Sequence, residues 1–289
     1  MTQTEYLSQI ERAINEIESI DYSNSWSYEQ VVHSILKIPH LPIILFTEPR
    51  GNLIFRSRIN NDITPFETVS DISLPKEDFV LSFARANKPK QSLFYGSENR
   101  PTSYMEFAMH LAETTPFNKE VSLTVGSWEI QRNLIFALVF NPTMVRNNIY
   151  NKTHGEYFDD FISKAPEEFR IGIIKFFEFI AEKYANQVEQ NDIKTYQITC
   201  AYSNIIFAYG QCDGIMYPSV PRLGDAFNVV IKKNSIDEGV LVLKNARMDK
   251  FVAREQSNGK HEFLNISSMD AINIETEKIE WSNKWEISS

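Results

Sequence analysis

The longest apolar helical pattern in the chain covers residues 158 to about 188. Apolar side chains are so dense in its middle that a helix there has to be buried rather than lie on the surface. Pro166 is expected to divide this region into two helices, because proline interrupts a helix interior. A further helix is predicted at residues 196–209. The apolar residues of the long pattern are Ile173, Ile174, Phe176, Phe177, Ile180 and Ala181.

Strand patterns account for much of the remaining chain. Short runs rich in β-branched and aromatic residues predict strands at 43–47, 53–59, 92–95, 121–128, 134–140, 215–217, 228–232 and 240–243. The first two are joined by the turn sequence Glu48-Pro-Arg-Gly51. Loops are expected at 60–84 and at 141–155. Beyond about residue 248 only short β-like pieces are expected, at 263–264 and 272–274.

Two amphipathic helices are predicted at the start of the chain, at residues 4–20 and 27–37, and Pro39 and Pro42 end them. They are interpreted as a packing layer, with a partner-binding arm as the alternative. Strands dominate around two helical layers, so the predicted class is α+β. The predicted parts are a helical arm (1–42), a main domain (43–250) with a helical insertion at about 141–195, and a β-rich tail (251–289) packed on that domain.

The formal net charge is −9, which argues against a nucleic acid or an anionic membrane as the main partner. A small anionic ligand is still compatible, since a few local arginines can bind one. The two cysteines imply neither a disulfide framework nor a metal cluster. Neither a signal peptide nor a membrane-spanning apolar run is visible, and a cytoplasmic protein is expected.

Several common catalytic motifs are missing from the sequence. It contains no phosphate-binding glycine-rich loop, no dinucleotide fingerprint, no G-x-S-x-G elbow and no zinc-protease helix. With ten glycines in the chain, glycine-rich loops have little to draw on. The five histidines are scattered and are interpreted as structural or surface residues.

Polar residues gather instead around a predicted strand and helix at 85–106. Arg85 precedes a turn that contains Asn87, Tyr95 ends the strand, and Glu106 lies in the helix pattern. Charge at both ends of a strand–helix unit is a common way to build a pocket. The alternative to a pocket residue is that Glu106 is a solvent-exposed helix residue.

Two other stretches add polar groups to this set. Arg56 and Arg58 are two residues apart, so they share one face of a strand. Such a pair is either a solvent-facing edge or part of a site. Downstream, residues 213–219 read Asp-Gly-Ile-Met-Tyr-Pro-Ser. Ser219 alone is compatible with a simple turn or a helix cap.

Together these residues resemble the RES-domain family, which is named for its Arg, Glu and Ser. The central signature is matched by Arg85, Asn87, Tyr95 and Glu106, with Tyr95 ten residues after Arg85 and Glu106 eleven after Tyr95. The family's upstream strand arginine is matched by Arg56, with Arg58 as the alternative, and its late serine motif by Gly214–Ser219.

The resemblance covers about residues 53–232. Compact toxin members of the family are much shorter. This chain inserts about ninety residues between Phe107 and Tyr196, and it adds the helical arm and the C-terminal tail.

The resemblance implies an ADP-ribosyltransferase-like mixed β core and an enzyme that cleaves NAD, a glycohydrolase or phosphorylase that releases nicotinamide. NAD would be the substrate and no metal would be needed. The setting would be a toxin, defence or effector protein, with an antitoxin or another protein as partner. The alternatives are a non-catalytic module that binds a nucleotide or a protein, and an ADP-ribosyltransferase acting on a macromolecule.

Residue roles follow from the same resemblance. Arg85, Glu106 and Ser219 would be catalytic, and Arg56, Arg58, Asn87, Tyr95 and Tyr217 would bind the dinucleotide. The residue types suit the chemistry. Arginine forks grip a pyrophosphate, and a carboxylate stabilises the positive charge that develops on a sugar when its glycosidic bond breaks.

Overall fold

The computed structural model describes residues 1–187, 192–220, 225–282 and 284–287. The helices are α1 (Gln3–Glu18), α2 (Ser27–Leu36), α3 (Val69–Ile72), α4 (Arg100–Thr114), α5 (Ile149–Lys164), α6 (Glu167–Ala185), α7 (Ile193–Ala208) and α8 (Lys233–Asp237). The strands are β1 (Ile44–Glu48), β2 (Leu53–Asn60), β3 (Leu93–Ser97), β4 (Glu120–Ile130), β5 (Leu134–Leu138), β6 (Gly214–Pro218), β7 (Phe227–Lys232), β8 (Leu241–Glu255), β9 (His261–Glu275), β10 (Lys278–Trp281) and β11 (Glu286–Ile287). A short 3₁₀ turn covers Glu77–Phe79.

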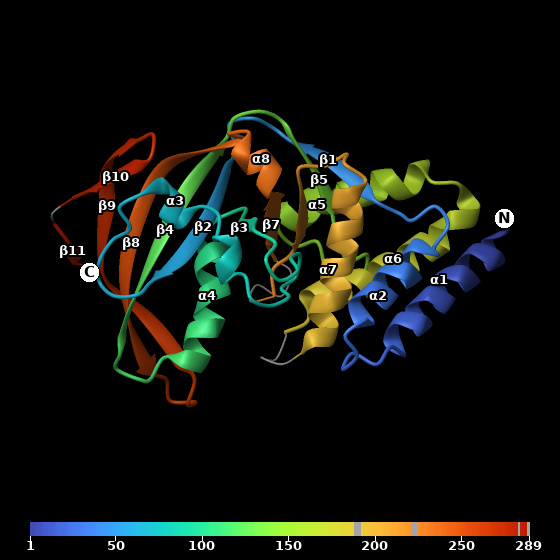
Figure 1. Ribbon diagram of the computed structural model, residues 1–289, viewed down its shortest axis with the longest axis horizontal. Coiled ribbons are helices and arrows are strands. Elements are labelled where there is room, and N and C mark those ends of the chain that lie inside the picture. Colours follow the sequence, from blue (N-terminus) through green and yellow to red (C-terminus); the bar gives the residue numbers. More distant parts are fainter. Residues whose placement is uncertain (188–191, 221–224, 283, 288–289) are drawn as a thin grey trace.

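All these strands belong to one mixed sheet. Their order is β1-β5-β6-β7-β3-β2-β4-β8-β9-β10, and β11 pairs with β9. Strands β5 and β6 are parallel, whereas the other paired strands are antiparallel. Most helices gather at the N-terminal end of the molecule and the long strands β4, β8 and β9 at the other, with the two termini at opposite ends (Figure 1). The predicted α+β class is confirmed.

The sheet is nearly interrupted between β2 and β3. Strand β2 pairs with β4 along its whole length, but in the described chain its register with β3 is the single pair Phe55↔Ser97. Strand β3 pairs over its whole length with β7 on its other side. The two strands therefore separate on one side of that pair, and backbone and side chains there are free to line a cavity.

The apolar helix pattern of the sequence forms the centre of the helical layer. Phe176, Phe177 and Ile180 of α6 are fully buried, and Pro166 is the N-cap residue that separates α5 from α6. Helix α6 packs on the sheet through Tyr184, whose ring centroid is 5.0 Å from that of Tyr217 on β6. The predicted burial and the predicted break are both confirmed.

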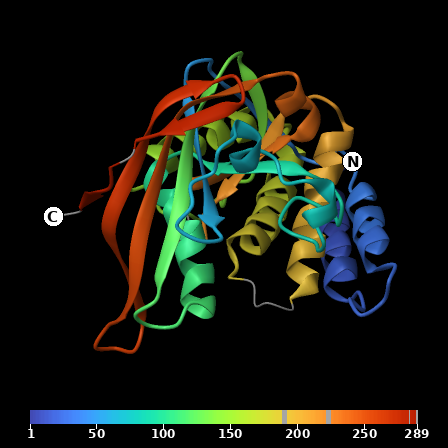
Figure 2. The same cartoon turned by 60° about the vertical axis from the view of Figure 1, so that its left-hand side comes forward.

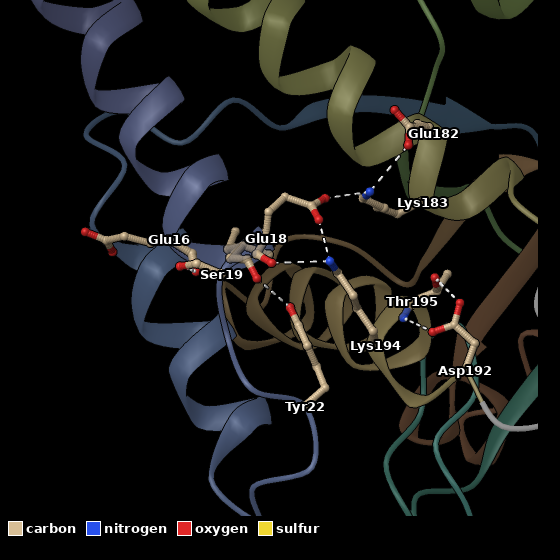
Figure 3. Close-up of polar contacts among 10 residues, drawn as sticks. Glu16, Glu18, Ser19, Tyr22, Glu182, Lys183, Asp192, Lys194 and Thr195 are labelled. Carbon is tan, nitrogen blue, oxygen red and sulfur yellow. Dashed lines mark hydrogen bonds and ion pairs between the residues drawn. The ribbon is translucent and has the colours of Figure 1, made fainter.

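Helices α1 and α2 form an outer layer on α6 and α7, respectively. The carboxylate of Glu18 on α1 lies between Lys183 of α6, at 2.6 Å, and Lys194 of α7 (Figure 3). Burial alone would raise the pKa of Glu18, but the hydrogen bonds from the two lysines outweigh it and lower the pKa. The buried hydroxyl of Ser27 on α2 donates to the side-chain oxygen of Gln197 on α7 at 2.6 Å. The arm is thus tied to the two helices that cover the sheet.

Three sequence predictions of local structure are wrong. The predicted loop at 60–84 contains helix α3 and the 3₁₀ turn Glu77–Phe79. The predicted loop at 141–155 ends early, because α5 begins at Ile149 with Asn148 as its N-cap. The Asn148 side chain accepts from the backbone N–H of Asn151 at 2.9 Å, so the asparagines start a helix rather than extend a loop.

The tail was expected to hold only short strands, yet β8 and β9 have fifteen residues each. Polar and charged residues are scattered along both strands, on buried as well as exposed positions, which hides the strand pattern in the sequence. Antiparallel strands tolerate this because one face can meet water.

The strands before and after Glu48-Pro-Arg-Gly51 do form, but β1 pairs with β5 and β2 with β3 and β4. In the described chain no helix is long and apolar enough to cross a membrane.

We expect Gly172→Ala to destabilise the protein, although alanine usually favours a helix. A Cβ atom at Gly172 on α6 would lie 2.5 Å from the ring of Tyr6 on α1. Tyr6 is fully buried and packs on Phe169, so it has little room to move. Overpacking of this kind costs about 1–3 kcal/mol. A Tm lower by several degrees in thermal unfolding is the expected result. Lys175→Ala, at an exposed position of the same helix, should leave Tm nearly unchanged, and an equal Tm for both variants would contradict the proposed contact.

Candidate functional site

A cavity of about 440 Å³ lies where β2 and β3 separate. Strands β2, β3, β6 and β7 and helix α4 all contribute side chains to it. Its volume is within the usual range of about 300–1,000 Å³ for small-molecule sites. The residues that line it are Arg56, Ser57, Arg58, Ile59, Tyr95, Gly96, Ser97, Ser103, Glu106, Phe107, Tyr217 and Asn228.

Helix α4 is fixed against this cavity near its start. Asn99 caps the helix, its side-chain oxygen accepting from the backbone N–H of Thr102 at 2.9 Å. One turn further, the hydroxyl of Ser103 is 2.7 Å from that of Ser57 on β2. Glu106 is three residues after Ser103, so both side chains lie on the same face of the helix. The cap and the serine pair therefore aim Glu106 at the sheet.

The carboxylate of Glu106 is held by two hydrogen bonds on one oxygen. Its Oε1 accepts from the hydroxyl of Ser219 and from Nδ2 of Asn228, each at 2.6 Å. The side-chain oxygen of Asn228 accepts in turn from the hydroxyl of Ser97 at 2.8 Å. Ser219 and Asn228 are 0% and 5% exposed. Among the described residues Oε2 of Glu106 has no hydrogen-bond partner, which leaves one oxygen available to a ligand in the cavity.

Two arginines of β2 supply positive charge. Arg56 donates through Nη1 to the backbone oxygen of Tyr95 at 2.6 Å, which bridges the gap between β2 and β3. Its Nε is buried without a partner in the described chain. Burial, and then the charge of Arg58, lower the pKa of Arg56 to about 9, so it stays protonated at neutral pH. A buried cation with an unpartnered donor favours an anionic ligand.

Arg58 also lines the cavity and contacts the segment around helix α3. It donates to the backbone oxygen of Asp71 and lies over the ring of Phe66, 5.6 Å from its centroid. Burial is the main effect on its pKa and lowers it. No carboxylate of the described chain lies within ion-pair distance of either arginine.

Two tyrosines form the aromatic wall of the cavity. The hydroxyl of Tyr95 donates to Oδ1 of Asn87 at 2.7 Å and accepts from the backbone N–H of Ala86 at 3.1 Å. Asn87 is itself buried and does not line the cavity, so it acts on the site by orienting Tyr95. Burial raises the pKa of Tyr217 well above its usual value, Tyr95 and Glu106 add to this, and Arg85 opposes it.

The structure places Arg85 behind this wall rather than in the lining. Its guanidinium donates to the backbone oxygens of Lys183 at 3.1 Å and Asn186 at 2.6 Å, at the C-terminal end of α6. It also lies over the ring of Tyr196, 5.8 Å from its centroid. A cation suits a helix C-terminus, where unpaired carbonyls gather. Burial raises the pKa of Tyr95 and Tyr217, and the charge of Arg85 opposes this in part.

Asp213, the first residue of the Ser219 motif, has a structural position. Its carboxylate accepts two hydrogen bonds from Arg132, at 3.0 and 2.7 Å, and others from the backbone N–H of Ile135 and the hydroxyl of Ser235. Burial acts to raise the pKa of Asp213, but these bonds lower it overall. Asp213 thus fixes the start of β6, and the strand then carries Ser219 to Glu106.

Sequence reasoning assigned no role to Asn228, Ser97 or Ser103. The signal for Asn228 was available, since it is a polar residue inside the apolar strand β7. Its contact with Ser97 depends on the register Ser97↔Asn228 between β3 and β7, which the sequence does not reveal. Among the described residues, no three His, Cys, Asp or Glu side chains are grouped so as to hold a metal ion.

Three comparisons with known proteins were informative only at the level of a distant structural likeness. No protein-family model matches the sequence, and no curated protein does so either. Among the solved structures with a similar chain is the crystal structure of the M. tuberculosis MbcT-MbcA toxin-antitoxin complex. The TM-score is 0.38 at 10% sequence identity, over 69% of this chain and 85% of that chain.

The carboxylate of Asp213 should contribute to the stability of the fold only while it is ionised. The folded-state pKa is lowered, so the ionised group stabilises the fold above the unfolded pKa of about 3.9, and this contribution is lost as pH falls through the folded pKa. We expect Asp213→Asn to lower Tm at pH 7 and the difference from the wild type to shrink below about pH 4. Asp237→Asn, at an exposed pair on α8, should show a small difference at every pH. A deficit for Asp213→Asn that is the same from pH 7 to pH 3 would rule out the ionic role.

Proposed function

We propose that this chain cleaves NAD at the bond between nicotinamide and ribose, in the cavity between β2 and β3. The observation that carries the proposal is the state of Glu106. One carboxylate oxygen is fixed by Ser219 and Asn228, and Glu106 lines a cavity that is also lined by Arg56 and aromatic rings. This is a preorganised negative charge beside a binding place for an anion, the combination that the reaction needs.

The substrate's pyrophosphate would interact with the arginines of β2. Arg56 lines the cavity with a buried positive charge, which favours an anion at this place. Arg58 lies two residues further along the strand and adds a second positive charge. NAD is larger than the ligands that a cavity of this volume usually holds. Its nicotinamide–ribose half would enter the cavity, and its adenosine half would extend outward.

Glu106 would act on the sugar. As the C–N bond breaks, its electron pair leaves with nicotinamide, which becomes neutral, and positive charge develops on the ribose ring. Oε2 of Glu106 would stabilise that charge or accept from a ribose hydroxyl. Water then adds to the anomeric carbon and releases a proton to solvent, giving ADP-ribose. Preorganised electrostatic stabilisation of this kind is often the largest catalytic contribution.

The other residues would position these partners. Ser219 and Asn228 hold the carboxylate, and Tyr95 and Tyr217 border the nicotinamide ring. Arg85 and Asn87 are proposed to act through the tyrosines, Asn87 by a hydrogen bond and Arg85 by its charge. The resemblance to RES proteins further suggests a toxin, defence or effector role and a protein partner.

Related outcomes use the same site. Phosphate in place of water would give phosphorolysis, and a macromolecular acceptor would give ADP-ribosyl transfer. A site that binds the nucleotide without turnover is the non-catalytic alternative. Mass spectrometry of the products after incubation with NAD, with and without phosphate, separates these outcomes.

Glu106→Gln should lower the rate of nicotinamide release by about 10²–10³-fold, because glutamine keeps the size of the side chain and removes its charge. The measurement is free nicotinamide after incubation of the purified chain with NAD. The loss is expected mainly in kcat, since the charge matters most in the transition state.

Glu11→Gln is the matched control, because Glu11 is exposed on α1, and its rate should equal that of the wild type. A wild-type chain that binds NAD but releases no nicotinamide would exclude the enzymatic proposal and favour the non-catalytic alternative.

Substitutions of Arg56 and Arg85 should differ in their effects on NAD binding and on thermal stability. Arg56→Ala is expected to raise KM for NAD more than it lowers kcat, and Arg56→Lys to restore binding only in part, since lysine lacks the planar fork. Arg85→Ala should raise KM as well but also lower Tm, because two backbone oxygens at the end of α6 lose their donor. An unchanged KM in Arg56→Ala would remove Arg56 from the binding site.

A further inference from the structure

The two edges of the sheet differ in how the rest of the chain covers them. At the β10 edge, the segment before α3 supplies backbone partners. The N–H of Ile279 donates to the backbone oxygen of Glu67 at 2.8 Å, and the N–H of Val69 donates to that of Glu277 at 3.0 Å. The pairing of β10 with β9 also contains a bulge at Glu280. A covered and irregular edge of this kind resists pairing with another chain.

Strand β1 is the other edge, and the register shows which of its backbone groups face outward. The backbone oxygen of Ile135 on β5 accepts from the N–H of Asp213, so Ile135 turns its backbone groups toward β6. Thr47 lies opposite Ile135 in the antiparallel pair. Opposite residues either exchange hydrogen bonds or both face away from each other. Thr47, and Leu45 two residues before it, therefore point their N–H and C=O groups away from the sheet.

This outer edge of β1 is open and has few protective features. Within the described chain, the backbone groups of Leu45 and Thr47 have no hydrogen-bond partner. Both residues are exposed, and Leu45 is 41% exposed. The pairing with β5 contains no bulge, and β1 holds no lysine or proline. An apolar, regular edge with unpaired backbone groups is a template for a further strand.

A cavity of about 630 Å³ lies beside this edge, and we refer to it as the edge groove. Ile43 and Leu45 line it from the edge strand, and Phe161 of α5 and Phe169 of α6 line it from the helices. Tyr209, which follows α7, completes an aromatic lining and is 55% exposed. An extended chain paired with β1 would therefore meet apolar surface with its side chains.

The charge of the edge groove favours one kind of extended chain. Among the described residues of its lining there is no aspartate or glutamate, although the formal net charge of the whole chain is −9. The lining does contain Lys164. Lys164 pairs with Asp160 at 2.6 Å, but both side chains are largely exposed, and such pairs contribute little. The ammonium group can therefore turn to a carboxylate brought into the groove.

We propose that β1 takes up an extended, acidic segment of a partner protein as an added strand. The outward backbone groups of Leu45 and Thr47 would bind the segment's backbone. Its apolar side chains would lie in the edge groove, and an acidic residue would face Lys164. In this mode of recognition the backbone bonds give affinity and the side-chain pockets give selection. The edge groove shares no lining residue with the Glu106 cavity, and the proposal does not depend on NAD cleavage.

The test is a heteronuclear NMR titration of the isotopically labelled full chain with the peptide acetyl-Asp-Val-Thr-Val-Thr-Val-amide. The amide hydrogens of Leu45 and Thr47 should exchange more slowly with solvent in the complex, because they gain acceptors. The same peptide N-methylated at every valine and threonine cannot form the strand and should bind at least about tenfold more weakly. No binding of the first peptide at millimolar concentration, unchanged exchange at the two amides, or equal affinities for the two peptides would overturn the proposal.

Variants at one position then locate the added strand. Leu45→Pro removes an outward N–H, which an edge strand tolerates, and should weaken peptide binding by at least about tenfold. Leu45→Val keeps the N–H and the apolar side chain, so it is the matched control and should bind as the wild type does. A Leu45→Pro chain that is folded and binds the peptide with wild-type affinity would refute the assignment. The comparison of the two peptides needs no variant.

The acidic residue is tested separately. The wild type should bind the peptide about twofold to fivefold more tightly than its analogue with asparagine in place of aspartate, as expected for an exposed ion pair. Lys164→Ala should abolish this preference and leave the affinity for the asparagine analogue unchanged. A preference that persists in Lys164→Ala would exclude Lys164 as the partner of the carboxylate.

Discussion

The register between β3 and β7 is the constraint on which the Glu106 site depends. It sets Ser97 opposite Asn228, so that the serine orients the asparagine and the asparagine holds the carboxylate. A slip of one residue would turn Asn228 to the other face of the sheet. Because α4 begins only three residues after β3, the same register also sets where Glu106 meets Ser219.

The near-break between β2 and β3 gives this site its opening. A continuous sheet would use the backbone groups there for pairing and leave no space for a ligand. The single pair Phe55↔Ser97 keeps the two halves together, and the bond from Arg56 to the backbone of Tyr95 crosses the opening. A charged side chain therefore stands where strand pairing ends, which is an expensive place for a cation in the absence of an anion.

Much of the fold follows from local patterns, and the parts that do not follow depend on partners distant in sequence. The α+β class, the outer helices and the buried helix with its break at Pro166 were predictable, because periodicity and proline act locally. The fifteen-residue strands β8 and β9 were not, since polar and charged residues are scattered along them and their pairing is with each other and with β4. The turn sequence after β1 correctly predicted two strands. It did not show that β1 and β2 pair with other strands rather than with each other, because pairing depends on partners distant in sequence.

The candidate site shows the same division. The sequence singled out Glu106 and Ser219, and the structure joins them by a hydrogen bond across more than a hundred residues. It could not show that Arg85 binds the end of α6, because α6 lies about a hundred residues further along the chain. Asn228 was visible as a polar residue in an apolar strand, but its role depends on Ser97 across the sheet and on Glu106, which the sequence does not place beside it.

The position of Arg85 links the first helix of the chain to the Glu106 cavity. Glu18 of α1 binds the side chain of Lys183 (Figure 3). The backbone oxygen of Lys183 accepts a hydrogen bond from Arg85, and the charge of Arg85 acts on Tyr217. Figure 2 shows α1 and α2 on the side of the molecule away from the long strands. Anything that lifted α1 from α6 would loosen the hold on Arg85 and so change the electric field at the tyrosines. The outer helices would then influence the chemistry of a cavity that they do not touch.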